Sequence, residues 1–226
     1  MNLAMDKLID IIMVIPILLI ALPFHEWAHA YVAYRLGDPT AKDAGRLTLN
    51  PFRHLDPFGT LMMLVANVGW ARPVPVNSGY FRDRRKGMIL VALAGPFSNL
   101  LLAFLFTVIW GLMVKLAVIG VIPVESEAAI TVISWLQVFF RFCVLVNISL
   151  AVFNMIPVPP LDGSRLISSF IPEESYYRFA RYEQYIGIAF LALVIFVPNA
   201  LSSVIRLVAD PIYESMLTVV SLVLRL

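Results

Sequence analysis

Long apolar stretches separated by short polar connections run along the whole chain. Four of them are about as long as the roughly 20 residues that a helix needs to cross a bilayer. These stretches run from Lys7 to Leu36, from Met88 to Val114, from Thr131 to Ile156 and from Tyr182 to Val197. The pattern predicts an all-α protein whose helices span a membrane several times.

The last apolar stretch, Ala200 to Leu226, is less uniform than the others. It carries Arg206, Asp210 and Glu214 among its apolar residues. Ionisable side chains are costly in a bilayer unless they face the interior of the protein, whereas an interfacial helix carries them on its polar face. This segment is therefore either a fifth span or an interfacial helix, and we expect about four to five transmembrane helices in total.

An irregular stretch from Thr40 to Lys86 separates the first two spans. It holds a candidate strand at Arg46 to Leu49 and an apolar segment, Phe58 to Trp70, that is too short to cross a bilayer. Non-helical backbone at membrane depth is tolerated only against protein or a wet cavity. We therefore expect a small re-entrant element with some β character in this region.

An extended string, Pro73-Val74-Pro75-Val76, lies near the end of this stretch. Proline has no N–H group, so the valines supply the only donors, and these point to one edge of the extended chain. Such an edge would suit the addition of a substrate strand. A rigid connector without substrate contact is the alternative, and both interpretations stay open here.

Composition agrees with a membrane protein. Hydrophobic residues make up 60% of the 226 residues, charged residues 14%, and the mean hydropathy is +0.85, whereas soluble domains are roughly half apolar and a quarter charged. The spans use most of the length, so residues 1–226 are predicted to form a single domain. The net charge of +2 gives no reason to expect nucleic acid as a partner.

The segment with the most chemical content is His25-Glu26-Trp27-Ala28-His29, near the end of the first apolar stretch. On a helix the two histidines lie one turn apart on one face, close enough to bind a single zinc ion. Glu26 would then lie beside the metal as a general base for a water that the metal has made more acidic. The motif predicts a hydrolytic zinc centre with His25 and His29 as ligands and Glu26 as the catalytic residue.

Catalytic zinc sites normally have three protein ligands, so a third is expected elsewhere in the chain. Asp162 is the stronger candidate, because the prolines at 157, 159 and 160 break the preceding helix and a carboxylate at such a break needs a partner. His54 is the only other histidine. Its simpler interpretation is a structural role or support of a ligand.

These motifs together resemble the site-2 protease family of intramembrane zinc metalloproteases. The H-E-x-x-H string and the later N-x-x-P-x-P-P-L-D-G string, Asn154 to Gly163, are similar to the family's two signatures in their usual order. Gly95 to Asn99 is similar to its small-residue motif, and His54 to Pro57 and Pro73 to Asn77 read like its small prokaryotic members. The PDZ or CBS domain that many members carry is not expected here, because the chain has no room for one.

The resemblance implies one zinc ion per chain, bound by His25, His29 and Asp162, with Glu26 as the base. It also implies that the substrates are transmembrane proteins or peptides. Gly95 and Asn99 are expected only to let helices approach closely. For Asn154 two interpretations stay open, since it could contact the substrate or hydrogen-bond to another helix.

The distribution of basic residues predicts the orientation. By the positive-inside rule, the basic connection after the first span faces the cytoplasm, whereas the connection from Ile119 to Ala129 carries two glutamates and no basic residue. The basic residues of the first connection are Arg35, Lys42, Arg46, Arg53, Arg72, Arg82, Arg84, Arg85 and Lys86. We therefore expect a multi-pass protein of the cell (inner) membrane with its active site toward the cytoplasmic side.

Taken together, the sequence predicts an intramembrane zinc metalloprotease that cuts peptide bonds within or near transmembrane segments. Its expected partners are a membrane-spanning substrate and the lipid bilayer. The principal alternative is an intramembrane metal transporter or sensor without hydrolytic activity. The base next to the first ligand argues against it, as does the lack of a repeated half with matching broken helices. A catalytically silent scaffold is a weaker alternative, because all four site residues are intact.

Overall fold

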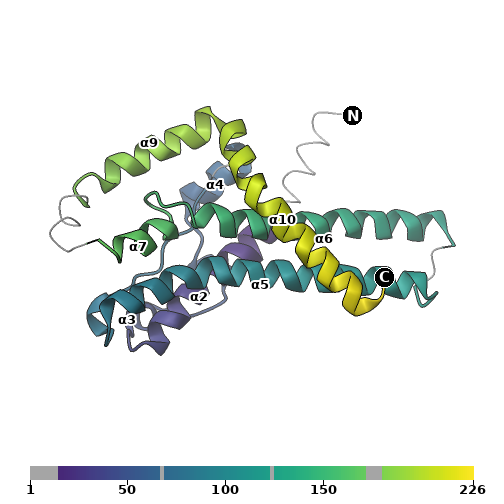
Figure 1. Cartoon of the computed structure of the whole chain (residues 1–226), viewed down its shortest axis with the longest axis horizontal. Coiled ribbons are helices and arrows are strands. Elements are labelled where there is room, and N and C mark those ends of the chain that lie inside the picture. Colours follow the sequence, from purple (N-terminus) through teal and green to yellow (C-terminus); the bar gives the residue numbers. More distant parts are fainter. Residues whose placement is uncertain (1–14, 67–68, 123–124, 172–179) are drawn as a thin grey trace.

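The computed structural model describes residues 15–66, 69–122, 125–171 and 180–226, and within these ranges every named element is helical (Figure 1). The elements are η1 (Ile17–Ala21), α2 (Leu22–Arg35), α3 (Thr40–Asp43), η2 (Pro51–Arg53), α4 (Pro57–Ala66), η3 (Ser78–Tyr80), α5 (Arg84–Val118), α6 (Glu127–Asn154), α7 (Asp162–Ser168), α9 (Glu183–Phe196) and α10 (Pro198–Leu224). The all-α prediction is confirmed.

Three of these helices are long and apolar enough to cross a membrane. They are α5, α6 and the part of α10 from Leu201 to Leu224. Their starts follow from the sequence: the Asp83 side chain accepts a hydrogen bond from Lys86 N at 3.0 Å, and that of Ser126 accepts one from Ala129 N at 3.2 Å, so each caps a helix amino terminus. The multispanning architecture is thereby confirmed.

The three long helices share one core. Figure 1 shows α5 and α6 running along the long axis with α10 crossing them obliquely. Buried side chains from all three meet there: Ala103, Val144, Ile148, Ala209 and Tyr213. At one end of the bundle the Lys115 ammonium donates to the carbonyl of Leu224, which satisfies an otherwise free acceptor in the last turn of α10. The segment from 200 onward therefore packs against α5 and α6, and its length and apolar character favour the fifth span over the interfacial helix.

One predicted span differs from expectation, and another is described only in part. The fourth, Tyr182 to Val197, corresponds to α9, which has 14 residues and so a length of about 21 Å, less than the roughly 30 Å of a bilayer core. The first was expected to begin at Lys7, and residues 1–14 lie outside the described ranges. Its described part consists of η1 and α2, with the π-helical turn of η1 ending just before Pro23, whose missing N–H disfavours a regular ladder there.

The connection between α2 and α5 is mostly irregular. The strand expected at Arg46 to Leu49 does not form, and the β character of the described residues is limited to one antiparallel bridge between Leu55 and Ala71. Phe58 to Trp70 contains α4, a helix of 10 residues that is too short to span, as expected. A short piece of strand without a neighbouring sheet has few backbone partners, which explains why the candidate strand is not stable here.

An extended segment, Arg72 to Asn77, follows the bridge and is held by buried polar groups. Arg72 N–H donates to the carbonyl of His54 at 2.7 Å, and Arg72 C=O accepts from the Arg46 guanidinium. At the other end, Asn77 N–H donates to the fully buried carboxylate of Asp38 at 2.7 Å. The segment is thus fixed at both ends to the turn and loop that follow α2.

Candidate metal centre

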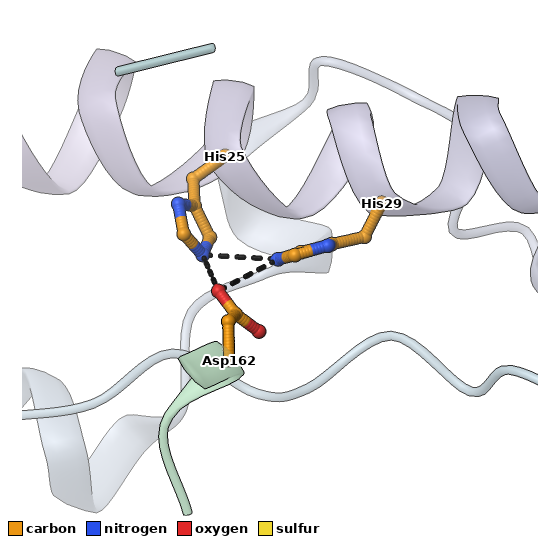
Figure 2. Close-up of side chains that lie close together, drawn as sticks. All are labelled: His25, His29 and Asp162. Atoms are coloured by element: carbon orange, nitrogen blue, oxygen red, sulfur yellow. Dashed lines mark hydrogen bonds and ion pairs between the residues drawn. The ribbon is translucent and has the colours of Figure 1, made fainter. Parts of the chain in front are cut away.

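Three buried side chains converge on one point between α2 and α7 (Figure 2). Asp162 Oδ2 lies 3.2 Å from Nε2 of His25 and 3.2 Å from Nε2 of His29, and the two Nε2 atoms lie 3.1 Å apart. Exposed fractions are 6% for His25, 5% for His29 and 8% for Asp162. The structure therefore brings together the three residues that the sequence predicted as ligands.

The hydrogen bonds made by the two imidazole rings indicate that the cluster can bind a cation. His29 Nδ1 donates to the carbonyl of Val91 at 2.7 Å, and His25 Nδ1 lies 3.1 Å from Oδ1 of Asn99, so each ring carries its proton on Nδ1. Both Nε2 atoms then present lone pairs to a carboxylate oxygen that is buried and has no hydrogen-bond donor. Three acceptors at such distances repel one another unless a positive ion lies between them.

The spacing of these acceptors also suits zinc. Tetrahedral zinc binds histidine nitrogen and carboxylate oxygen at about 2.0–2.2 Å, which places neighbouring ligand atoms about 3.3–3.5 Å apart. The three observed separations of 3.1–3.2 Å lie within a few tenths of an ångström of this range. The donor set of two imidazoles and one carboxylate is one that catalytic zinc sites use.

The break after α6 is what brings Asp162 to the histidines. α6 ends at Asn154, and the proline-rich turn that follows leads into α7, of which Asp162 is the first residue. A Cβ at the next residue, Gly163, would lie 2.3 Å from the carbonyl oxygen of Met155. Glycine at 163 therefore permits α7 to start against the end of α6, and this contact sets the direction of the Asp162 side chain.

One face of α5 lies against the two histidines. Val91, Gly95 and Asn99 are spaced four residues apart, so they form a single row on that helix. A Cβ at position 95 would lie 2.3 Å from Nε2 of His29 and 2.6 Å from Nε2 of His25. Gly95 thus allows close approach, as predicted, but the neighbours are the imidazoles themselves. Asn99 was expected only to pack, and it instead holds the His25 ring by a hydrogen bond.

Glu26 lies beside this cluster and is held by the extended segment. Its Oε2 accepts a hydrogen bond from Val74 N–H at 3.0 Å. The carboxylate is also close enough to His29 to interact with it electrostatically. The edge of the extended segment that the sequence suggested as open for a substrate strand is therefore occupied at Val74 by the predicted catalytic glutamate.

His54 lies away from the cluster and has a structural environment. Its side chain is fully buried, and Nε2 donates to the carbonyl of Thr48 at 2.7 Å. Burial lowers the pKa of His54, so the ring is neutral at pH 7. Its own carbonyl accepts from Arg72 N–H, which links this histidine to the extended segment. The geometry favours Asp162 over His54 as a third ligand.

The two asparagines of α6 turn back on their own helix. Asn147 Nδ2 donates to the carbonyl of Cys143 at 2.8 Å, and Asn154 Nδ2 donates to that of Leu150 at 2.9 Å. These local hydrogen bonds are of a kind common for polar residues inside helices, while Oδ1 of Asn147 is buried without a hydrogen-bond partner among the described residues. The expected contact between Asn154 and a substrate stays a prediction.

Comparison with known proteins identifies the family of this chain. The model of peptidase family M50 matches residues 13–195, a range that contains the two histidines, Glu26 and Asp162. The chain belongs to peptidase family M50, the site-2 protease family. No solved structure shows a significant match to the chain.

Two relatives within the family have names that describe zinc metalloproteases. The chain is 46% identical over 178 residues to YwhC of Bacillus subtilis strain 168, covering 79% of this chain and 78% of YwhC, which is named as a zinc metalloprotease. It is 30% identical over 194 residues to Rip2 of Mycobacterium tuberculosis H37Rv, likewise named, covering 83% and 68%. This protein is a membrane zinc metalloprotease.

Several supporting residues could not be assigned from the sequence. The backbone carbonyl of Val91 carries no sequence signal, since any residue supplies one. The i, i+4, i+8 spacing of Val91, Gly95 and Asn99 was a usable signal, because it places a small residue and an amide on one helix face. Arg46 gave no signal beyond its charge.

We predict that Gly95→Ala removes zinc from the protein. The added methyl group would overlap both imidazoles, and α5 cannot withdraw without disturbing its packing. Zinc content of the purified variant, measured by elemental analysis, tests this. Gly187→Ala is the matched control, because its Cβ would meet nothing nearer than 3.6 Å. Full zinc content in Gly95→Ala would contradict the position of α5.

We also predict that Asn99→Ala weakens zinc binding by about 10- to 100-fold, the range typical for loss of a group that orients a metal-binding histidine. Without the amide oxygen, the His25 ring can rotate or carry its proton on Nε2. Competition with a zinc chelator gives the affinity. Asn147→Ala serves as control, since Asn147 is equally buried but bonds only to its own helix. Equal affinities for the two variants would refute the assigned role.

Proposed function

We propose that the protein is an intramembrane protease that cleaves peptide bonds within or near the transmembrane segments of other membrane proteins, as in regulated intramembrane proteolysis. His25, His29 and Asp162 bind the zinc ion, and Glu26 is the catalytic base. The strongest support is the convergence of three proton-free acceptors beside a glutamate, in a bundle whose long helices are apolar enough to span a membrane.

Each residue has a defined part in this proposal. When bound, zinc supplies Lewis-acid polarisation of the scissile carbonyl and acidifies water at the site. The two histidines and Asp162 would hold the metal, as the three protein ligands of catalytic zinc sites do. Glu26 takes a proton from the attacking water and delivers it to the leaving amine. Val91 and Asn99 keep the imidazole lone pairs directed at the metal position.

The substrate class follows from the surroundings of the site. A peptide bond inside a membrane helix has its backbone groups hydrogen-bonded and covered by side chains, so it must unwind locally before it can reach a recessed metal. We therefore expect the partners to be a transmembrane protein or peptide and the lipid bilayer. We further propose that residues 1–226 act as one membrane protease domain, because α10 packs on the helices that form the site.

The active site is proposed to lie toward the cytoplasmic side of the cell (inner) membrane. Gly95 follows Arg84, the first residue of α5, by 11 positions, which corresponds to about 16 Å along the helix. The site is thus nearer to the end of α5 that carries Arg84, Arg85 and Lys86 than to its other end. By the positive-inside rule, that end faces the cytoplasm.

We predict that zinc binding and hydrolysis separate at Glu26. Glu26→Gln should keep the metal and lose at least about 100-fold in cleavage, because the amide cannot accept the proton from water. Purified, zinc-loaded protein and a model transmembrane peptide provide the assay, with metal content measured on the same sample. Near wild-type cleavage by Glu26→Gln would refute the proposed role of Glu26 as the catalytic base.

The ligand assignment is tested in the same assay. Asp162→Ala should lose zinc together with activity, because it removes one of three ligands. His54→Ala should keep zinc, although loss of the buried hydrogen bond from its Nε2 to the Thr48 carbonyl is expected to lower the thermal midpoint of unfolding. The reverse result, with zinc kept in Asp162→Ala and lost in His54→Ala, would reassign the third ligand.

The topology has its own test. In a Cys143→Ser background, a cysteine placed at Arg84 should resist an impermeant thiol reagent added to intact cells and react after the membrane is opened. A cysteine at Ser126, which precedes α6 at the opposite end of the bundle, should react in intact cells. Labelling of the Arg84 site in intact cells would reverse the proposed orientation.

A further inference from the structure

Arg46 is a buried cation outside the metal centre. Only 6% of the residue is exposed, although it lies in an irregular connection where arginines usually reach solvent. Its guanidinium donates to the carbonyl of Arg72, while Nε is buried without a hydrogen-bond partner. A desolvated charge with incomplete hydrogen bonding is unfavourable, so its retention calls for a role beyond filling space.

The contact with Arg72 continues along the chain to Glu26. Arg72 is held on both sides, by His54 through its N–H and by Arg46 through its C=O. Val74 is two residues further along the extended segment, so its N–H points to the same edge as that of Arg72. This N–H is the donor that holds Oε2 of Glu26 at 3.0 Å.

Proline makes this connection stiff. Pro73 lies between the two residues, and its ring fixes φ, so the orientation of the Arg72 peptide is passed on to the amide of Val74. The guanidinium of Arg46 also interacts electrostatically with the Glu26 carboxylate. Arg46 therefore fixes the extended segment whose Val74 amide contacts Glu26.

We propose that Arg46 is a positioning residue for Glu26. By fixing the Arg72 carbonyl it keeps the Val74 amide against one carboxylate oxygen, which leaves the other oxygen of Glu26 to face the attacking water. This inference rests on the proposed role of Glu26 as the base. General-base catalysis depends on such placement, since a misplacement of about 1 Å can cost about 100-fold in rate.

The extended segment offers a direct readout of this arrangement. Prolines at 73 and 75 have no amide proton, so its exchangeable amides are those of Arg72, Val74, Val76 and Asn77. Arg72 and Val74 depend on the Arg46 end of the segment, whereas Asn77 is held separately by Asp38. In Arg46→Ala, residue-resolved amide exchange should speed up at Val74 and stay unchanged at Asn77.

Steady-state kinetics of zinc-loaded protein on a model transmembrane peptide complete the test. Arg46→Ala should lower kcat by about 10- to 100-fold with KM and zinc content close to wild type, because the base is misplaced while metal and substrate contacts remain. Arg46→Lys, which can still donate to the Arg72 carbonyl, should restore part of kcat. Arg53→Ala, at an exposed arginine of the same connection, should behave as wild type.

A matched pair of proline substitutions removes the final link alone. Val74→Pro deletes the N–H that reaches Glu26, whereas Val76→Pro deletes one for which the described residues offer no hydrogen-bond acceptor. Val74→Pro should reproduce the loss of kcat seen in Arg46→Ala, and Val76→Pro should not. If Arg46→Ala proves too unstable to purify, this pair and Arg46→Lys carry the test.

The outcomes are distinct. Unchanged exchange at Val74 in Arg46→Ala, or faster exchange with wild-type kcat, would overturn the proposal, as would equal effects of Val74→Pro and Val76→Pro. If the wild-type protein fails to cleave any membrane peptide, the proposed protease function fails instead, and the exchange experiment still reports whether Arg46 holds the Val74 amide.

Discussion

The close approach of α5 to α2 at Gly95 is the constraint on which the rest of the site depends. Because position 95 has no side chain, one row of α5 can contact both imidazoles, with Val91 C=O on one ring and the Asn99 amide on the other. These two hydrogen bonds place both ring protons away from the centre. Three lone pairs then face one another, an arrangement that a bound metal ion would stabilise.

A second set of buried polar contacts fixes the glutamate relative to this centre. Asp38, Arg46 and His54 lie in the irregular connection after α2, and each is bonded to backbone of the extended segment. Without sheet partners, that backbone would otherwise leave donors and acceptors unsatisfied. The segment is thus held by two side chains and one loop carbonyl rather than by a sheet, which explains why a β pattern in the sequence gives almost no β structure here.

The N–H of Val74 already donates to Glu26, which restricts where a substrate strand could pair with the extended segment. An unwound substrate that pairs with the edge of the extended segment at Val74 would have to displace the hydrogen bond to Glu26, the proposed catalytic base. Pairing elsewhere along the segment would leave that bond in place. Substrate pairing at Val74 would therefore be coupled to the placement of Glu26 through a single backbone amide.

The sequence by itself determined the helical membrane architecture and predicted that His25, His29 and Asp162 form one site, because apolar length, helical spacing and a proline break are local properties. Only the tertiary structure showed that α10 packs against α5 and α6, that α9 is too short to span alone, and that Val91 and Asn99 contact the two histidines while Arg46 contacts the extended segment. These contacts join residues that are far apart in the chain, and a carbonyl or a buried arginine acquires a role only from the groups packed against it.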